Sequence, residues 1–141
     1  MVQEKFGLEV VYPIHPRARK QTEAFDMKLE GLRLIEPLDY FSFLNLENNA
    51  RLVLTDSGGV QEETCILNVP CVTLRDNTER PVTLENGTNV LVGSDPHKII
   101  QEFDRVLGNE PKADRFPHFW DGKAAKRIIE VLVDEFRLSD R

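Results

Sequence analysis

Short runs of apolar residues alternate along this chain with longer amphipathic stretches, a pattern typical of repeated strand–helix units. Several of the apolar runs are nearly continuous in Val, Leu and Ile, as expected of parallel strands that are buried on both faces. The predicted strands are residues 8–13, 32–35, 51–55, 70–74 and 89–92. The helices predicted to follow them are residues 17–25, 40–49, 60–67, 80–85 and 96–107. The pattern therefore predicts an α/β fold in which helices flank a parallel sheet.

The ends of three predicted helices carry residues that favour a helix boundary. Asp39 and Asp95 precede helices, and their carboxylates can accept hydrogen bonds from the free amides of the first turn. Asn68 follows a helix and tolerates the left-handed backbone conformation that closes one. A last helix, residues 122–136, has its apolar side chains along one stripe at helical spacing, so we expect it to be a packing helix.

Composition narrows the possible functions. The 141 residues fit a single domain over 1–141, and the formal net charge of -6 argues against nucleic acid as a partner. No apolar run approaches the roughly 18 residues that suggest a membrane span, so no membrane partner is expected. The first residues are too polar for an export signal, which predicts a cytoplasmic location. Cys65 and Cys71 are too few for a metal site or a disulfide framework, and we expect both to be buried thiols.

The clearest candidate for chemistry is the turn after the third predicted strand. Ligands of open parallel sheets bind beyond the carboxyl ends of the strands, and Ser57, Gly58 and Gly59 lie at this point. Two glycines leave the free N–H groups of the next helix unshielded, so an anionic oxygen can approach them. The Ser57 hydroxyl can cap the helix or contact a phosphate. Glu63 lies one turn along the same helix face, at a suitable distance to accept hydrogen bonds from ribose hydroxyls.

A second interpretation of this turn is purely structural. In that case the glycines form a tight strand-to-helix turn, and the acidic residues after them complement the helix dipole. Arg75 and Arg80 follow the next strand and fall at the same sheet edge if the strands are parallel, where one of them can clamp phosphate charge. Each arginine can equally be a solvated loop residue, so the residues alone leave both interpretations open.

Two further groups are suited to parts of a nucleotide. His15 and Arg17 close the first apolar run with an imidazole and a guanidinium, although a lone histidine is usually structural. Tyr40, Phe41 and Phe43 open the helix before the glycine turn, where an aromatic ring can stack on a nucleobase. Periodicity does not tell which of the three rings faces a ligand, and each is equally consistent with packing.

The spacing and identity of several motifs resemble the non-hydrolysing UDP-N-acetylglucosamine 2-epimerases, and the resemblance covers nearly the whole chain. The motifs are HPR at 15–17, DSGGVQEE at 56–63, LNVP at 67–70, LRDNTERP at 74–81, GTN at 87–89, LVG at 91–93 and DGKAA at 121–125. The stretch at 56–63 is the most specific of them. The resemblance implies a Rossmann-like lobe, namely the carboxy-terminal, nucleotide-binding lobe of a glycosyltransferase-B type fold.

The resemblance also implies an isomerase activity and a set of binding residues. The family inverts C2 of UDP-N-acetylglucosamine (UDP-GlcNAc) to give UDP-N-acetylmannosamine (UDP-ManNAc), by elimination and re-addition of UDP, without a cofactor and in polysaccharide biosynthesis. The implied binding residues are Ser57, Gly58 and Gly59 for the diphosphate, Glu63 for the ribose, Phe43 for the uracil, Arg80 for phosphate, and His15 and Arg17 for a diphosphate or an activating second nucleotide-sugar.

Two positions depart from the family pattern, and one group of residues is missing from it. Asn68 stands where the family has Gly, which keeps the same backbone region accessible, and Val82 stands where many members have Glu. The acidic residues that move protons in the family lie in its amino-terminal lobe, which we do not expect in this chain. General acid–base catalysis needs a titrating group within reach of the proton, so the chain alone is predicted to bind UDP weakly and to be inactive.

Two other functions stay open at the level of the sequence. One is the donor-binding lobe of a glycosyltransferase with the same fold, and the other is a stand-alone UDP-sugar-binding module. An incomplete lobe would expose a sheet edge and a lobe interface, so we expect either a homodimer or an amino-terminal lobe as the partner.

Overall fold

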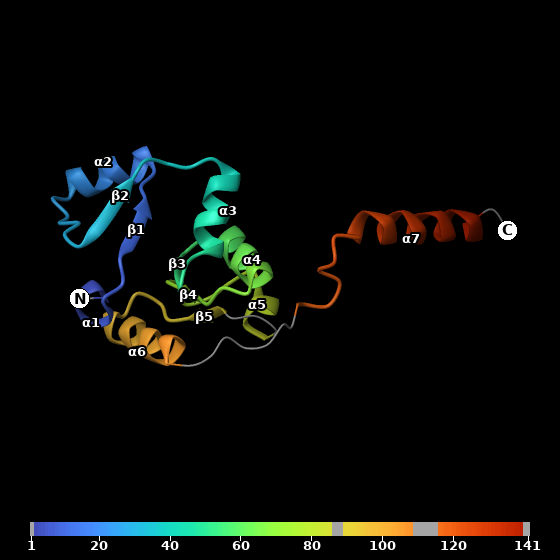
Figure 1. Ribbon diagram of the computed structural model, residues 1–141. Helices are drawn as coiled ribbons and strands as arrows, with labels where there is room; N and C mark the ends of the chain where they lie inside the picture. The colour runs from blue at the N-terminus through green and yellow to red at the C-terminus, as the bar shows by residue number, and fades with distance from the viewer. Residues whose placement is uncertain (1, 86–88, 109–115, 140–141) are drawn as a thin grey trace. The chain divides into compact units, whose positions relative to one another are not determined.

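The computed structural model describes residues 2–85, 89–108 and 116–139, and the chain divides into two compact units, residues 1–49 and 50–141. Strands and helices alternate as the pattern predicts (Figure 1). The five strands pair within two sheets, one in each unit. The expectation of a single lobe over residues 1–141 stays a prediction.

The first unit pairs two short parallel strands, with Val10 opposite Leu32. Its elements are α1 (Val2–Phe6), β1 (Val10–Pro13), α2 (Pro16–Ala24), β2 (Leu32–Ile35) and α3 (Tyr40–Asn48). Helix α1 was not predicted, and β1 begins two residues later than the apolar run does. Gly7 separates the two elements with a φ of 64°, a left-handed conformation that ends α1 before the chain becomes extended.

The second unit contains a three-stranded parallel sheet in the order β3-β4-β5, with Val53 opposite Cys71 and Cys71 opposite Asn89. Its elements are β3 (Val53–Thr55), α4 (Gly58–Leu67), β4 (Cys71–Thr73), α5 (Pro81–Glu85), β5 (Asn89–Leu91), α6 (Pro96–Leu107) and α7 (Ala124–Ser139). Helix α4 contacts all three strands, and α5 contacts both β5 and α4. The parallel pairing brings the carboxyl ends of β3 and β4 to one edge of the sheet.

The core of the second unit is centred on β4, in which every residue is buried because strands pair with it on both sides. Its buried apolar residues are Cys65, Val69, Cys71, Val72, Val92 and Phe103. Both cysteines are therefore buried thiols, as predicted. Burial raises the pKa of the Cys65 thiol, because a thiolate is disfavoured away from water.

The three helix boundaries predicted from the sequence are confirmed. The Asp39 carboxylate accepts hydrogen bonds from two amides in the first turn of α3, each at 3.1 Å. The Asp95 carboxylate accepts one, from the His97 amide of α6 at 2.9 Å. A hydrogen bond from the Ser42 hydroxyl, followed by the Ser42 amide, lowers the pKa of Asp39. Asn68 closes α4 in the left-handed conformation, with a φ of 54°.

Helix α7 begins two residues later than predicted, because Gly122 has a φ of 73° and cannot belong to the helix. The residues of its apolar stripe are 40–71% exposed: Ile128, Ile129, Leu132, Val133 and Phe136. Its role as a packing helix therefore stays a prediction. Of the connector predicted at 108–119, residues 109–115 lie outside the described residues, as do residues 87 and 88 of the GTN motif. Within the described part of the chain, no helix has the length and apolar composition to cross a membrane.

Candidate functional site

The glycine turn lies at the start of α4, which begins at Gly58 rather than at the predicted residue 60. Ser57 is the residue before the helix, and Gly58 and Gly59 are its first two residues, so their amides are among the N–H groups without a partner inside the helix. The Ser57 side chain makes no capping hydrogen bond, while its amide donates to Thr55 Oγ1 at 3.0 Å. Of the two roles considered for the Ser57 hydroxyl, capping is therefore wrong, and the hydroxyl is available to a ligand.

Neither glycine is required by the local backbone. The glycines with positive φ in the described chain are Gly7, Gly31, Gly93 and Gly122, so Gly58 and Gly59 have conformations that other residues adopt. A Cβ on Gly59 would meet only Ser57 Oγ, at 3.8 Å, and a Cβ on Gly58 would make only ordinary van der Waals contacts. A tight turn therefore does not explain the two glycines, and their lack of side chains leaves the backbone amides of the helix start open.

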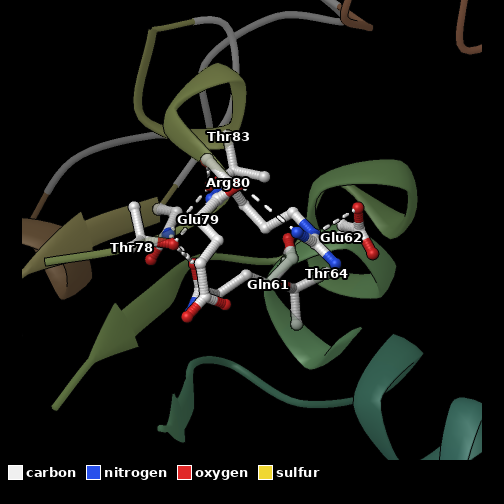
Figure 2. A network of polar contacts seen from close by, with 8 residues as sticks. Gln61, Glu62, Thr64, Thr78, Glu79, Arg80 and Thr83 are labelled. Atoms are coloured by element: carbon white, nitrogen blue, oxygen red, sulfur yellow. Dashed lines mark hydrogen bonds and ion pairs between the residues drawn. The ribbon is translucent and has the colours of Figure 1, made fainter. Parts of the chain in front are cut away.

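Arg80 lies beside this helix start. A Cβ placed on Gly58 would be 3.9 Å from Arg80 Cγ, and Arg80 Nε lies 2.6 Å from Glu62 Oε1 (Figure 2). This contact is an ion pair without the alignment of a hydrogen bond. The two side chains are 39% and 40% exposed, so the pair contributes at most about 1 kcal/mol to stability. An anionic ligand can compete with Glu62 for the guanidinium.

Arg75 also follows β4, but its guanidinium is engaged elsewhere. Because β3 and β4 are parallel, the predicted placement of Arg75 and Arg80 at the same sheet edge as Ser57 is confirmed. Arg75 Nη2 donates to Glu79 Oε1 at 3.2 Å, in an ion pair between residues four positions apart in the loop. Arg80 is thus the arginine whose contacts tie it to α4.

Glu63 follows Glu62 on α4 and is half-buried. Its carboxylate forms no hydrogen bond or ion pair with the residues that the structure describes, so it remains an available acceptor. The same described residues contain no group of three His, Cys, Asp or Glu side chains that could hold a metal ion. The side chains around the start of α4 thus offer a hydroxyl, a guanidinium and a carboxylate to a ligand.

The candidates of the first unit have separate local settings. His15 precedes α2, and its Nδ1 accepts a hydrogen bond from the Arg17 amide at 3.2 Å. This arrangement assigns the imidazole proton to Nε2, which can still donate to an anion, and the Arg17 side chain is exposed. Phe43 is half-buried, whereas Tyr40 and Phe41 are 58% and 79% exposed and form an edge-to-face pair.

A buried polar cluster behind the glycine turn was not found from the sequence. Gln61, Thr83 and Asn89 are 0%, 0% and 8% exposed, and hydrogen bonds join Asn89 to each of the other two. The one signal for it was Asn89, a polar residue at the start of an otherwise apolar strand. Gln61 gave none, because a glutamine beside two glutamates in a first turn is typical of a solvated helix face.

Comparison with known proteins identifies a single family. The family model for UDP-N-acetylglucosamine 2-epimerase matches residues 1–133. The chain is 45% identical over 141 residues to the UDP-N-acetylglucosamine 2-epimerase of Methanococcus maripaludis, covering 95% of this chain and 37% of that protein. It is 40% identical over 131 residues to the enzyme of Escherichia coli K12, covering 89% of this chain and 35% of that protein.

Solved structures agree with these matches. The structure of Methanocaldococcus jannaschii UDP-GlcNAc 2-epimerase in complex with UDP-GlcNAc and UDP superimposes with a TM-score of 0.82 at 43% identity, covering 94% of this chain and 37% of that chain. The Neisseria meningitidis UDP-GlcNAc 2-epimerase bound to UDP-GlcNAc gives a TM-score of 0.73 at 34% identity, covering 94% and 38%. The chain thus spans a little over a third of the length of these relatives.

These likenesses confirm the predicted fold class: an α/β, Rossmann-like lobe of the glycosyltransferase-B type, the carboxy-terminal one. They also favour the epimerases over the glycosyltransferases that share this fold. With a family model that covers residues 1–133 and relatives up to 47% identical, the chain belongs to the UDP-N-acetylglucosamine 2-epimerase family.

Proposed function

We propose that this chain binds the UDP part of a UDP-sugar at the start of α4. The observation that carries the proposal is the position of Arg80 beside Gly58, the first of two glycines that the backbone does not require. Free amides at a helix start and a guanidinium next to them suit a diphosphate, because each donates hydrogen bonds to anionic oxygens. A relative that is 43% identical was solved in complex with UDP-GlcNAc and UDP, which supports the same ligand class here.

The remaining contacts are proposed from the chemistry of each side chain. The Ser57 hydroxyl and the amides of Gly58 and Gly59 hold the diphosphate, and the available carboxylate of Glu63 accepts hydrogen bonds from the ribose. In the first unit, Phe43 borders the uracil. His15 and Arg17 bind a diphosphate or an activating second nucleotide-sugar, through the Nε2 proton and the exposed guanidinium.

We further propose that this site serves the reaction of the family, which interconverts UDP-GlcNAc and UDP-ManNAc by elimination and re-addition of UDP. Elimination leaves negative charge on the departing diphosphate, which the helix dipole and Arg80 stabilise. The site thus holds the leaving group. No catalytic residue is assigned to this chain, and proton transfer at C2 requires groups from an amino-terminal lobe. A cytoplasmic location and a role in polysaccharide biosynthesis stay predictions.

Replacement of Gly59 by aspartate tests the diphosphate site. We expect Gly59→Asp to weaken UDP binding by at least about tenfold, since a fixed carboxylate would occupy the position of an anion and repel the ligand. Isothermal titration calorimetry with UDP, on the full 141-residue chain, measures the change.

Two matched variants separate charge at this site from other effects. Gly59→Ala adds an uncharged methyl group that meets only Ser57 Oγ, at an ordinary van der Waals distance, so its fold should be intact and its loss of affinity smaller than that of Gly59→Asp. Ser94→Asp adds the same charge beside the start of α6 in the same unit, and should bind UDP as the unmodified chain does. Unchanged UDP affinity in a folded Gly59→Asp protein would overturn the assignment.

A further inference from the structure

Behind the glycine turn lies a glutamine that is fully buried. Gln61 stands in α4, and its side-chain Oε1 accepts a hydrogen bond from the Thr78 hydroxyl at 2.6 Å (Figure 2). The same oxygen accepts a second one from Asn89 Nδ2 at 3.3 Å. Burial of an amide is costly unless the amide is hydrogen-bonded, so these two bonds define what Gln61 contacts. They join α4 to the loop after β4 and to the first residue of β5.

Two threonines of the same hydrogen-bond network hold the backbone amide and the backbone carbonyl of Arg80. The Thr78 hydroxyl that donates to Gln61 also accepts from the Arg80 amide at 3.0 Å. The Thr83 hydroxyl donates to the Arg80 carbonyl at 2.8 Å and accepts from Asn89 Nδ2 at 3.0 Å. The backbone amide and carbonyl of Arg80 are therefore both held by hydroxyls. These hydroxyls are in turn hydrogen-bonded to the side-chain amides of Gln61 and Asn89.

The network is anchored to the sheet. Asn89 opens β5, and its Oδ1 accepts from the hydroxyl of Thr73, a buried residue of β4, at 2.6 Å. Hydrogen bonds therefore connect the loop that carries Arg80 to β4, β5 and α4 at the same time. From this fixed backbone the Arg80 side chain passes beside Gly58 with its Cγ and reaches Glu62 with its Nε.

Filling space alone does not account for Gln61. Its Nε2 is buried without a hydrogen-bond partner among the described residues, so Oε1 is the atom that joins the side chain to its neighbours. An apolar side chain of the same size would fill the space but accept neither hydrogen bond. Buried polar groups can fix one arrangement of the groups around them, and the arrangement fixed here is that of the Arg80 backbone.

We infer that Gln61 is a positioning residue for the diphosphate site, which acts through Thr78 and the Arg80 backbone to hold the Arg80 guanidinium at the start of α4. The inference rests on the proposed function, in which Arg80 contacts phosphate. It assigns Gln61 no contact with the ligand.

Two variants remove the connection, and one keeps it. Gln61→Met replaces the acceptor by an apolar group of similar size, and Thr78→Val removes the hydroxyl that links Gln61 to Arg80. Thr78→Ser keeps that hydroxyl and is the matched control. We expect the first two to weaken UDP binding by about tenfold, or about 1.4 kcal/mol, and the third by less than about twofold. Should Gln61→Met fail to fold, the two Thr78 variants carry the test.

A double-mutant cycle with Arg80→Ala distinguishes positioning from a general loss of structure. If Gln61 acts through Arg80, Gln61→Met and Thr78→Val cause no further loss of UDP affinity once Arg80→Ala is present. Uridine, which has no phosphate, should bind all these proteins equally. An equal loss with and without Arg80, or equal losses for UDP and uridine, would overturn the inference.

Amide hydrogen exchange separates failure of this inference from failure of the proposed function. If the unmodified chain does not bind UDP, the proposed function fails, and the exchange rate of the Arg80 amide then decides the inference. Faster exchange in Gln61→Met and Thr78→Val than in Thr78→Ser supports the positioning role. If UDP binds but the variants bind it as tightly as the unmodified chain, the inference alone is overturned.

Discussion

At the scale of single residues, backbone conformation distinguishes two kinds of position. Some require a residue that adopts positive φ, and others have a glycine whose missing side chain leaves backbone amides open. Asn68 has a φ of 54° and closes α4, so its identity answers a demand of the backbone. Gly58 and Gly59 have no such demand placed on them, and their lack of a side chain matters because it leaves the amides of α4 open.

Because Asn68 caps α4 in the left-handed conformation, we expect glycine and alanine at this position to differ in stability. Asn68→Gly should equal or exceed the unmodified chain, because glycine adopts positive φ freely, whereas Asn68→Ala should lose about 1 kcal/mol. Urea unfolding of both variants measures the difference. Asn49, which closes α3 with a φ of -99°, is the matched control, and there alanine should be at least as stable as glycine. The same order at both positions would contradict the explanation.

At the scale of elements, the site depends on two loops that the parallel sheet brings to one edge. The turn after β3 starts α4, and the loop after β4 carries Arg80 towards it. The hydrogen bonds that hold this loop come from α4 and β5, elements on either side of it in the sequence. The position of Arg80 is thus a property of several elements together and not of its own loop.

Helices α6 and α7 are both amphipathic but differ in how the structure covers their apolar residues. Phe103 in α6 is 4% exposed, whereas Ile129 in α7 is 60% exposed. We expect Phe103→Ala to lower the free energy of unfolding by about 3–5 kcal/mol, and Ile129→Ala to change it by less than about 0.5 kcal/mol. Urea denaturation of the two variants tests both values. A loss of several kcal/mol for Ile129→Ala would instead support the packing role predicted for α7.

At the scale of the whole molecule, binding and catalysis are expected to separate. The chain spans 37% of the length of its Methanococcus maripaludis relative, and both carboxylates of α4 already have other roles. Glu62 pairs with Arg80, and Glu63 is proposed to bind the ribose. Neither is free to take or return the C2 proton of a bound sugar.

This separation predicts that the chain alone does not exchange the C2 proton of its substrate. Incubation of the 141-residue chain with UDP-GlcNAc in deuterated water should leave C2 unlabelled by mass spectrometry, under conditions in which calorimetry detects UDP binding. The intact epimerase of Methanocaldococcus jannaschii, treated in parallel, supplies the positive control. Chain-dependent deuterium at C2 would show that a proton-transfer group is present in these residues.

The sequence by itself determined which elements form and where the candidate glycine turn lies. Among the described residues, all five strands and six of the seven helices follow from apolar periodicity, caps such as Asp39, and the Gly and Asn positions between them, because these effects act over a few neighbouring residues. The glycine turn was likewise visible, since its pattern is local. Helix α1 was missed because its five residues are too few to show a helical stripe.

Only the tertiary structure decided how the candidate residues are connected. It placed Arg80 against α4 and paired Arg75 with Glu79, two outcomes that loop sequence leaves equally open. It also buried Gln61, which in sequence resembles its solvated neighbours, because Thr78 and Asn89, 17 and 28 residues away, meet it across the sheet edge. Hydrogen bonds between residues so far apart depend on parallel strand pairing, and no local pattern of hydrophobic and polar positions records which partners that pairing brings together.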